Sequence, residues 1–120
     1  MKLSEDLRGR TKAFAAKVIR LYVSLPKQRE EVRVVGKQLL RSGTSVAAHA
    51  REASRARSDA ELCSKLGGLL QEADESLLWL ELLAEECGMS GEMLEFLQGE
   101  ADELIAIFTT IISKVRKREG

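Results

Sequence analysis

The chain has 120 residues, a length that accommodates one domain with a buried core and is too short for two. Charged residues make up 32% of it, aromatic residues 4%, and one residue is proline, a composition that favours an all-helical protein over a β fold. Its formal net charge is zero, which argues against indiscriminate binding of nucleic acid.

The first predicted helix runs roughly from Glu5 to Ser24. Its apolar stripe, at steps of three and four residues or their multiples, consists of Leu7, Phe14, Val18, Leu21 and Leu25. Pro26 ends this helix, and because proline is tolerated in a first helical turn, it can also open the next one.

The second predicted helix spans roughly Lys27 to Ser54. Its seam carries two polar side chains and consists of Val32, Val35, Leu39, Ser42, Val46, His49 and Ala53, beside a flank of Gly36, Gly43, Ala47 and Ala50. Gly43, Thr44 and Ser45 each disfavour a helix interior by some tenths to about 1 kcal/mol. We therefore expect close packing against a neighbouring helix to hold this turn.

The third predicted helix begins at a capping box formed by Ser58 and Glu61, and Gly88 stops it in a left-handed conformation. Its seam is Leu62, Leu66, Leu69, Ala73, Leu77, Leu80 and Leu83. The fourth helix follows with Ser90 as N-cap. Its seam is Leu94, Leu97, Ala101, Leu104, Phe108, Ile111 and Val115.

Four amphipathic helices with short connections predict one domain, residues 1–120, folded as an antiparallel, up-down-up-down four-helix bundle. Further apolar residues lie outside the seams, at Leu70, Leu78, Trp79, Leu82, Ile105 and Ile112. A small monomer needs less apolar width, so we expect self-association.

Charge is divided unevenly along the chain. Residues 1–58 hold 14 Lys plus Arg against 5 Asp plus Glu, and residues 59–120 hold 5 against 14. Opposite fields of this size favour packing of the basic half on the acidic half, and they could equally join unlike faces of neighbouring subunits.

Neither an export signal nor a disulfide is predicted. The N-terminal residues lack an apolar signal core and no apolar run approaches membrane-spanning length, so we expect a cytoplasmic protein with no membrane partner. Cys63 and Cys87 lie 24 positions apart in one predicted helix. That separation is about 36 Å, too far for a bond between them.

No catalytic, cofactor or metal site can be assembled from the sequence, and we expect the protein not to be an enzyme. His49 is the single histidine and is interpreted as a buried, hydrogen-bonded residue or a subunit contact, in preference to a ligand. The many glutamates of the third helix lack the Glu-x-x-His pairs of di-metal bundles and are interpreted as a solvated face.

Basic residues cluster near the connection between the second and third helices, at Arg41, Arg51, Arg55 and Arg57, and others follow the first helix at Lys12, Lys17 and Arg20. They are either solvated and paired with carboxylates, or candidate contacts to a partner or to phosphates. No aromatic residues are interleaved with them, which excludes most modes of single-strand binding.

A spaced motif occupies the second helix, where Gln38, Arg41 and Ser45 form Gln-x-x-Arg-x-x-x-Ser and Glu52 follows; Trp79 belongs to a pattern in the third helix. On these residues nearly the whole chain resembles the family called four helix bundle proteins, or intervening-sequence proteins of 23S ribosomal RNA genes. The resemblance implies that Gln38, Arg41, Ser45, Glu52 and Trp79 serve packing. His49 departs from the asparagine usual at its position.

The resemblance also implies assembly as a homopentameric ring, which requires that one face of a subunit meet a different face of the next. Family function is mostly uncharacterised, and two alternatives remain. One is a non-enzymatic oligomeric scaffold that binds another protein. The other is an accessory factor that binds RNA or DNA, because the family's accessory variability proteins of diversity-generating retroelements bind nucleic acid and a reverse transcriptase.

Overall fold

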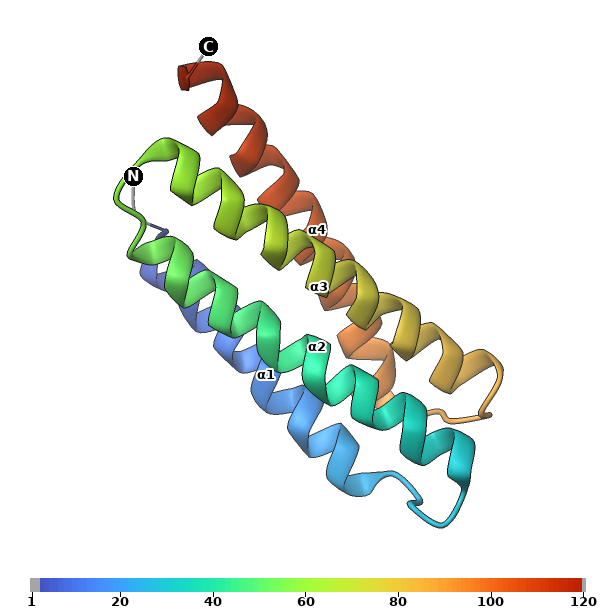
Figure 1. The fold of residues 1–120 in the computed structure, drawn as a ribbon. Helices are drawn as coiled ribbons and strands as arrows, with labels where there is room; N and C mark the ends of the chain where they lie inside the picture. Colours follow the sequence, from blue (N-terminus) through green and yellow to red (C-terminus); the bar gives the residue numbers. More distant parts are fainter. Residues whose placement is uncertain (1–2, 120) are drawn as a thin grey trace.

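The computed structural model describes residues 3–119, which form four antiparallel helices (Figure 1). They are α1 (Glu5–Ser24), α2 (Glu30–Ser54), α3 (Asp59–Glu85) and α4 (Glu92–Glu119). Each helix packs on the next and α4 contacts α1, giving an elongated bundle of 50 × 21 × 20 Å. Within residues 3–119 there is no strand, and no helix is both long and apolar enough to cross a membrane. The predicted all-α bundle is confirmed.

The connection between α1 and α2 is longer than expected, because α2 begins at Glu30 and not near Lys27. The ammonium group of Lys27 donates hydrogen bonds to the carbonyls of Tyr22 and Leu25, the latter at 2.9 Å. It also lies 4.4 Å from the centre of the Tyr22 ring. Lys27 therefore adds a donor to carbonyl groups at the end of α1, where helical partners run out, and Pro26 ends one helix without opening the next.

The ends of α3 follow the predicted signals, whereas the start of α4 does not. Ser58 Oγ accepts a hydrogen bond of 3.1 Å from the Glu61 N–H, and Gly88 has a φ of +70°. The prediction of Ser90 as the N-cap of α4 is wrong. The helix begins at Glu92, and the carbonyl of Gly91 accepts the hydrogen bond from the Glu95 N–H.

One apolar core runs through the bundle, with large, fully buried side chains from every helix that include Phe14, Leu39, Leu66, Leu80, Leu97 and Phe108. In places the buried face lies beside the predicted seam. Gly36, Gly43, Ala50, Ser76 and Ile112 are buried, while Val35, His49, Leu77 and Ile111 are only half-buried. A straight helix of 3.6 residues per turn drifts about 20° per seven residues, so a strict seam of threes and fours cannot stay buried along its full length.

The close packing predicted for α2 occurs against α1. A Cβ atom placed on Gly43 would lie 2.8 Å from Val18 Cγ2, and one on Gly36 would lie 2.9 Å from Leu25 Cδ1. Only residues without a side chain permit this approach of two helices. The two glycines lower the helix propensity of α2, and the close α1–α2 contact that they permit offsets this cost.

Charged groups join α1 to α4, the neighbouring pair with the fewest contacts. Arg10 Nη2 lies 2.8 Å from Glu100 Oε1, its Nε donates to Glu100 Oε2, and it also pairs with Glu103. These partners raise the pKa of Arg10, the hydrogen bond to Glu100 contributing most. Lys17 lies 4.0 Å from the centre of the Phe96 ring. The basic half thus packs on the acidic half within one chain, as the charge distribution predicted.

We expect Gly43→Ala to lower the free energy of unfolding by about 1–3 kcal/mol, because overpacking against Val18 outweighs a propensity gain of about 1 kcal/mol. Urea denaturation followed by far-UV circular dichroism measures the change. Gly99→Ala is the matched control in α4, since its new Cβ would meet no atom within 4 Å. The control should be stabilised, and equal stabilisation of both variants would contradict the packing argument.

Candidate functional site

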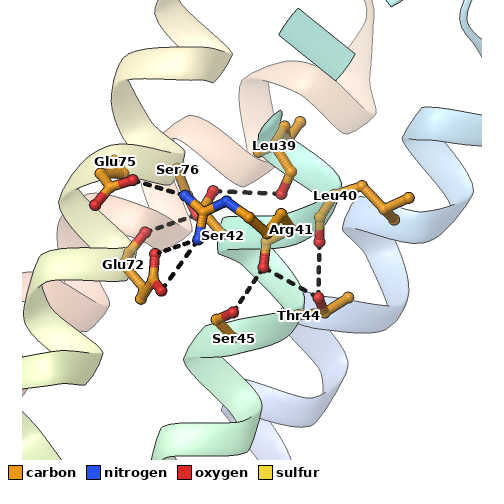
Figure 2. Close-up of polar contacts among 9 residues, drawn as sticks. All are labelled: Leu39, Leu40, Arg41, Ser42, Thr44, Ser45, Glu72, Glu75 and Ser76. Carbon is orange, nitrogen blue, oxygen red and sulfur yellow. Dashed lines mark hydrogen bonds and ion pairs between the residues drawn. The ribbon is translucent and has the colours of Figure 1, made fainter. Parts of the chain in front are cut away.

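The predicted motif residue Arg41 joins α2 to α3 (Figure 2). Its Nη2 lies 2.8 Å from Glu75 Oε1, and its Nη1 lies 3.2 and 3.3 Å from the two carboxylate oxygens of Glu72. The charge of Glu72 is the largest cause of a raised pKa at Arg41. The Arg41 side chain is 50% exposed, so the contact fixes the alignment of two helices more than it stabilises them.

Beneath this ion pair, two serine hydroxyls meet inside the core (Figure 2). Ser42 Oγ and Ser76 Oγ are 2.8 Å apart, and Ser76 also donates to the Glu72 carbonyl at 2.8 Å. Both residues are fully buried. Because each hydroxyl has partners, the polar pair can occupy an apolar core.

The neighbouring hydroxyls of α2 are satisfied by their own helix. Thr44 Oγ1 donates to the Leu40 carbonyl at 2.7 Å, and Ser45 Oγ donates to the Arg41 carbonyl at 2.8 Å. Such bonds to the preceding turn are typical of hydroxyl residues inside helices. The motif residue Ser45 therefore packs within α2.

The other predicted motif residues lie on the same pair of helices with fewer contacts. Gln38 is exposed, and Glu52 lies 3.7 Å from Lys65 of α3. Trp79 is half-buried, and its indole Nε1 is enclosed without a hydrogen-bond partner among the described residues. Of these three residues, Trp79 alone is half-buried, while Glu52 is exposed like Gln38, and the packing role that the resemblance implies stays a prediction.

His49 is half-buried against α3, and among the described residues its side chain has no hydrogen-bond partner, contrary to one of its two interpretations. Its Nδ1 lies 3.5 Å from Glu52 Oε1, and no hydrogen bond reaches that nitrogen within residues 3–119. A Cβ atom on Gly68 would lie 2.9 Å from His49 Cε1, so the ring occupies space that Gly68 leaves open. The position of His49 is thus set by packing.

The four candidate arginines do not form one cluster. Arg41 is engaged by α3, and Arg57 Nε lies 3.6 Å from Glu61 Oε2. Arg51 and Arg55 instead line a groove of about 1000 Å³ between α1 and α2, together with Arg8 and Lys12 of α1. The groove is also lined by small residues that include Gly9, Ala47, Ala48 and Ala50.

Sequence reasoning missed Arg8 and did not connect Lys12 with the arginines of α2. A signal was present: Arg8 and Lys12, like Arg51 and Arg55, are four positions apart and so share a helix face. Because α1 and α2 are antiparallel, the start of one lies beside the end of the other (Figure 1).

Within residues 3–119, no three His, Cys, Asp or Glu side chains come together as a potential metal site. Cys63 and Cys87 are both free thiols, the first half-buried and the second buried.

Comparison with known proteins agrees with this architecture. Residues 6–110 match the 23S rRNA-intervening sequence protein family. The chain belongs to this family. A solved structure of a protein with unknown function from the S23 ribosomal protein family of Bacteroides thetaiotaomicron VPI-5482 superposes with a TM-score of 0.80 and 35% sequence identity. The alignment covers 88% of this chain and 97% of that one.

None of the curated proteins compared with the chain matches it. The resemblance inferred from the motif of α2 and α3 is therefore confirmed at the level of the family. For this intervening-sequence family member, the match indicates no enzyme class, and the solved relative is itself of unknown function.

We expect the buried serine pair to show coupling in a double-mutant cycle. Ser42→Ala and Ser76→Ala should each lower the free energy of unfolding by about 1 kcal/mol, because each leaves a buried hydroxyl with one partner fewer. The double variant should be less destabilised than the sum of the two, by about 0.5–1.5 kcal/mol. Urea denaturation of the four proteins measures this, and strict additivity would show that the hydroxyls do not interact.

Proposed function

We propose that this protein is a non-enzymatic, homo-oligomeric scaffold of the cytoplasm, assembled as a pentameric ring. The observation that carries the proposal is the placement of its exposed large apolar side chains, which are Ile19, Val23, Val34, Leu78 and Phe96. They come from the last part of α1, the first part of α2, the last third of α3 and the first part of α4.

These positions share one end of the bundle, because adjacent helices are antiparallel (Figure 1). Val23 is 73% exposed and Leu78 is 45% exposed, whereas the predicted extra edge residue Ile112 is buried in the core. Of the apolar residues that lie outside the predicted seams, some are therefore buried within the chain, such as Ile112, and others stay exposed, such as Leu78. Apolar side chains gathered from four helices at one end support contact with further copies or with another protein.

A ring requires unlike surfaces to meet, and the molecule supplies unlike surfaces. Exposed apolar residues are found on each helix, and carboxylates such as Glu85, Glu86 and Glu95 are exposed near the same end. The family resemblance supports five copies in particular.

Size-exclusion chromatography with light scattering should show an oligomer at micromolar concentration. Val23→Lys combined with Leu78→Lys should shift the mass toward that of a monomer, because two charges would enter an apolar contact. Ala13→Lys combined with Gln71→Lys is the matched control, with the same charges at exposed positions of the same helices. A monomeric parent protein would overturn the proposal.

A second candidate function is the binding of RNA or DNA, favoured by the distribution of unpaired cations. Among residues 3–119, cationic side chains without an ion pair or ring contact lie mostly near the end opposite the apolar one: Arg8, Lys12, Arg51, Arg55, Lys114, Arg116 and Lys117. Unpaired cations can release counterions from phosphates on binding.

The ion pair of Arg57 gives this second function a direct test. Arg55→Glu should weaken the salt-sensitive binding of a labelled nucleic acid more than Arg57→Glu, because the Arg57 side chain already has a carboxylate at 3.6 Å. Fluorescence anisotropy of both variants at one salt concentration measures the difference. An equal effect of the two changes would show that the ion pair does not govern which arginine binds.

A further inference from the structure

We infer that the groove between the start of α1 and the end of α2 is a binding site for the phosphate backbone of a duplex nucleic acid, with Arg8 and Lys12 of α1 and Arg51 and Arg55 of α2 as its phosphate contacts. This inference rests on the second candidate function and names its site. The groove occupies about 1000 Å³ between the two helices.

The charge of the groove is available to a ligand. None of its four cations forms an ion pair within residues 3–119, whereas Arg10, Arg41 and Arg57 all do. Two carboxylates also line the groove, those of Glu5 and Glu52. Glu52 lies 3.7 Å from Lys65 of α3, so its charge is already offset.

The spacing of the cations forms two short rows. Arg8 and Lys12 are four residues apart on α1, and Arg51 and Arg55 are four residues apart on α2. Four residues of helix advance about 6 Å, so each wall of the groove presents two charges in line along its axis. A chain with charges repeated along its length fits two such rows better than a single small anion does.

The floor of the groove excludes other modes of recognition. Among residues 3–119, no aromatic residue on which bases could stack lines the groove, so contact falls to the backbone and not to unpaired bases. The apolar residues that line it within the described part of the chain are glycine and alanine. The groove therefore offers a protein partner no large apolar side chain of its own to pack against, although such contacts dominate most protein interfaces.

The charge also continues beyond the groove. Lys114, Arg116 and Lys117 are exposed near the end of α4, and Arg116 and Lys117 line a second hollow of about 460 Å³ against α3. Arg118 Nη2 pairs with Asp59 at 2.8 Å, which fixes this part of α4 to the start of α3 at the same end of the bundle (Figure 1). Cations on both sides of the α2–α3 connection favour a ligand longer than one phosphate group.

Fluorescence anisotropy of the full chain with a short RNA duplex of mixed sequence, and with the matching DNA duplex, tests the site across a salt series. Arg8→Glu combined with Lys12→Glu should weaken binding of the favoured duplex about tenfold or more. The slope of log Kd against log salt should become shallower by about 2, since two phosphate contacts are lost.

Arg20→Glu combined with Lys37→Glu is the matched control. It changes the net charge by the same amount at two exposed cations that are unpaired within residues 3–119 and lie outside the groove. Its affinity should change less than about twofold if position governs binding rather than net charge. Thermal unfolding of each variant confirms that the bundle is intact.

The outcomes separate the site from the function. Duplex binding by the parent protein that both double variants weaken equally would overturn the groove and leave nucleic-acid binding standing. No binding of either duplex at low salt would overturn both. Displacement of the duplex by polyglutamate at equal charge concentration would assign the groove to acidic peptides and overturn the phosphate site. A stronger response to RNA than to DNA would identify which backbone the site prefers.

Discussion

The close contact between α1 and α2 is the constraint on which the rest of the molecule depends. Gly36 and Gly43 let Leu25 and Val18 sit where Cβ atoms would otherwise stand. The groove between the same two helices lies further along, and it is lined by other small residues, among them Gly9 and Ala47, and by cationic side chains. Small residues on α1 and α2 therefore accompany both the close contact and the candidate binding surface.

The α2–α3 contact is organised differently. There the helices are aligned by polar groups at two depths, the buried Ser42–Ser76 pair and the exposed contacts of Arg41 with Glu72 and Glu75 (Figure 2). A buried hydroxyl pair contributes little net stability, but the Ser42–Ser76 contact forms in one register only, because a shift of either helix would break it and leave Ser76 with the Glu72 carbonyl of its own helix. Ser42, in the hydroxyl-rich turn of α2, thus fixes the register of α2 against α3 at a place where apolar contacts alone would let the two helices slide.

Most of the fold could be predicted from the sequence because apolar spacing, proline and glycine act locally. The bounds of α1, the N-cap Ser58 and the stop at Gly88 all follow from such signals. The start of α2 could not be predicted from Pro26, because Lys27 bonds back to carbonyls at the end of α1 and the next helix begins only at Glu30. Nor could the exchange of Leu77 for Ser76 in the core, which reflects the rotation of α3 against its neighbours.

The candidate site could be predicted only in part, because it too depends on contacts between helices. Arg51 and Arg55 were identified by their proximity in sequence, but which arginines remain unpaired is decided by carboxylates of other helices, such as Glu72 opposite Arg41. The contribution of Arg8 depends on the antiparallel alignment of α1 with α2. Ion pairs between helices form only in the folded chain, whereas the composition shows only that the net charge is zero.

Most of the unpaired cations lie toward the end of the 50 Å bundle opposite the exposed apolar residues, which has a consequence for any assembly joined at the apolar end. In such an assembly, every copy would hold its cationic end away from the contact between copies. Several of these ends could then reach one nucleic-acid chain. A second contact to that polymer would then be made at a high effective concentration, so attachment could become tight and slow to release even where a single copy binds only weakly. Such avidity requires no added contact, only a geometry in which several ends reach one strand together.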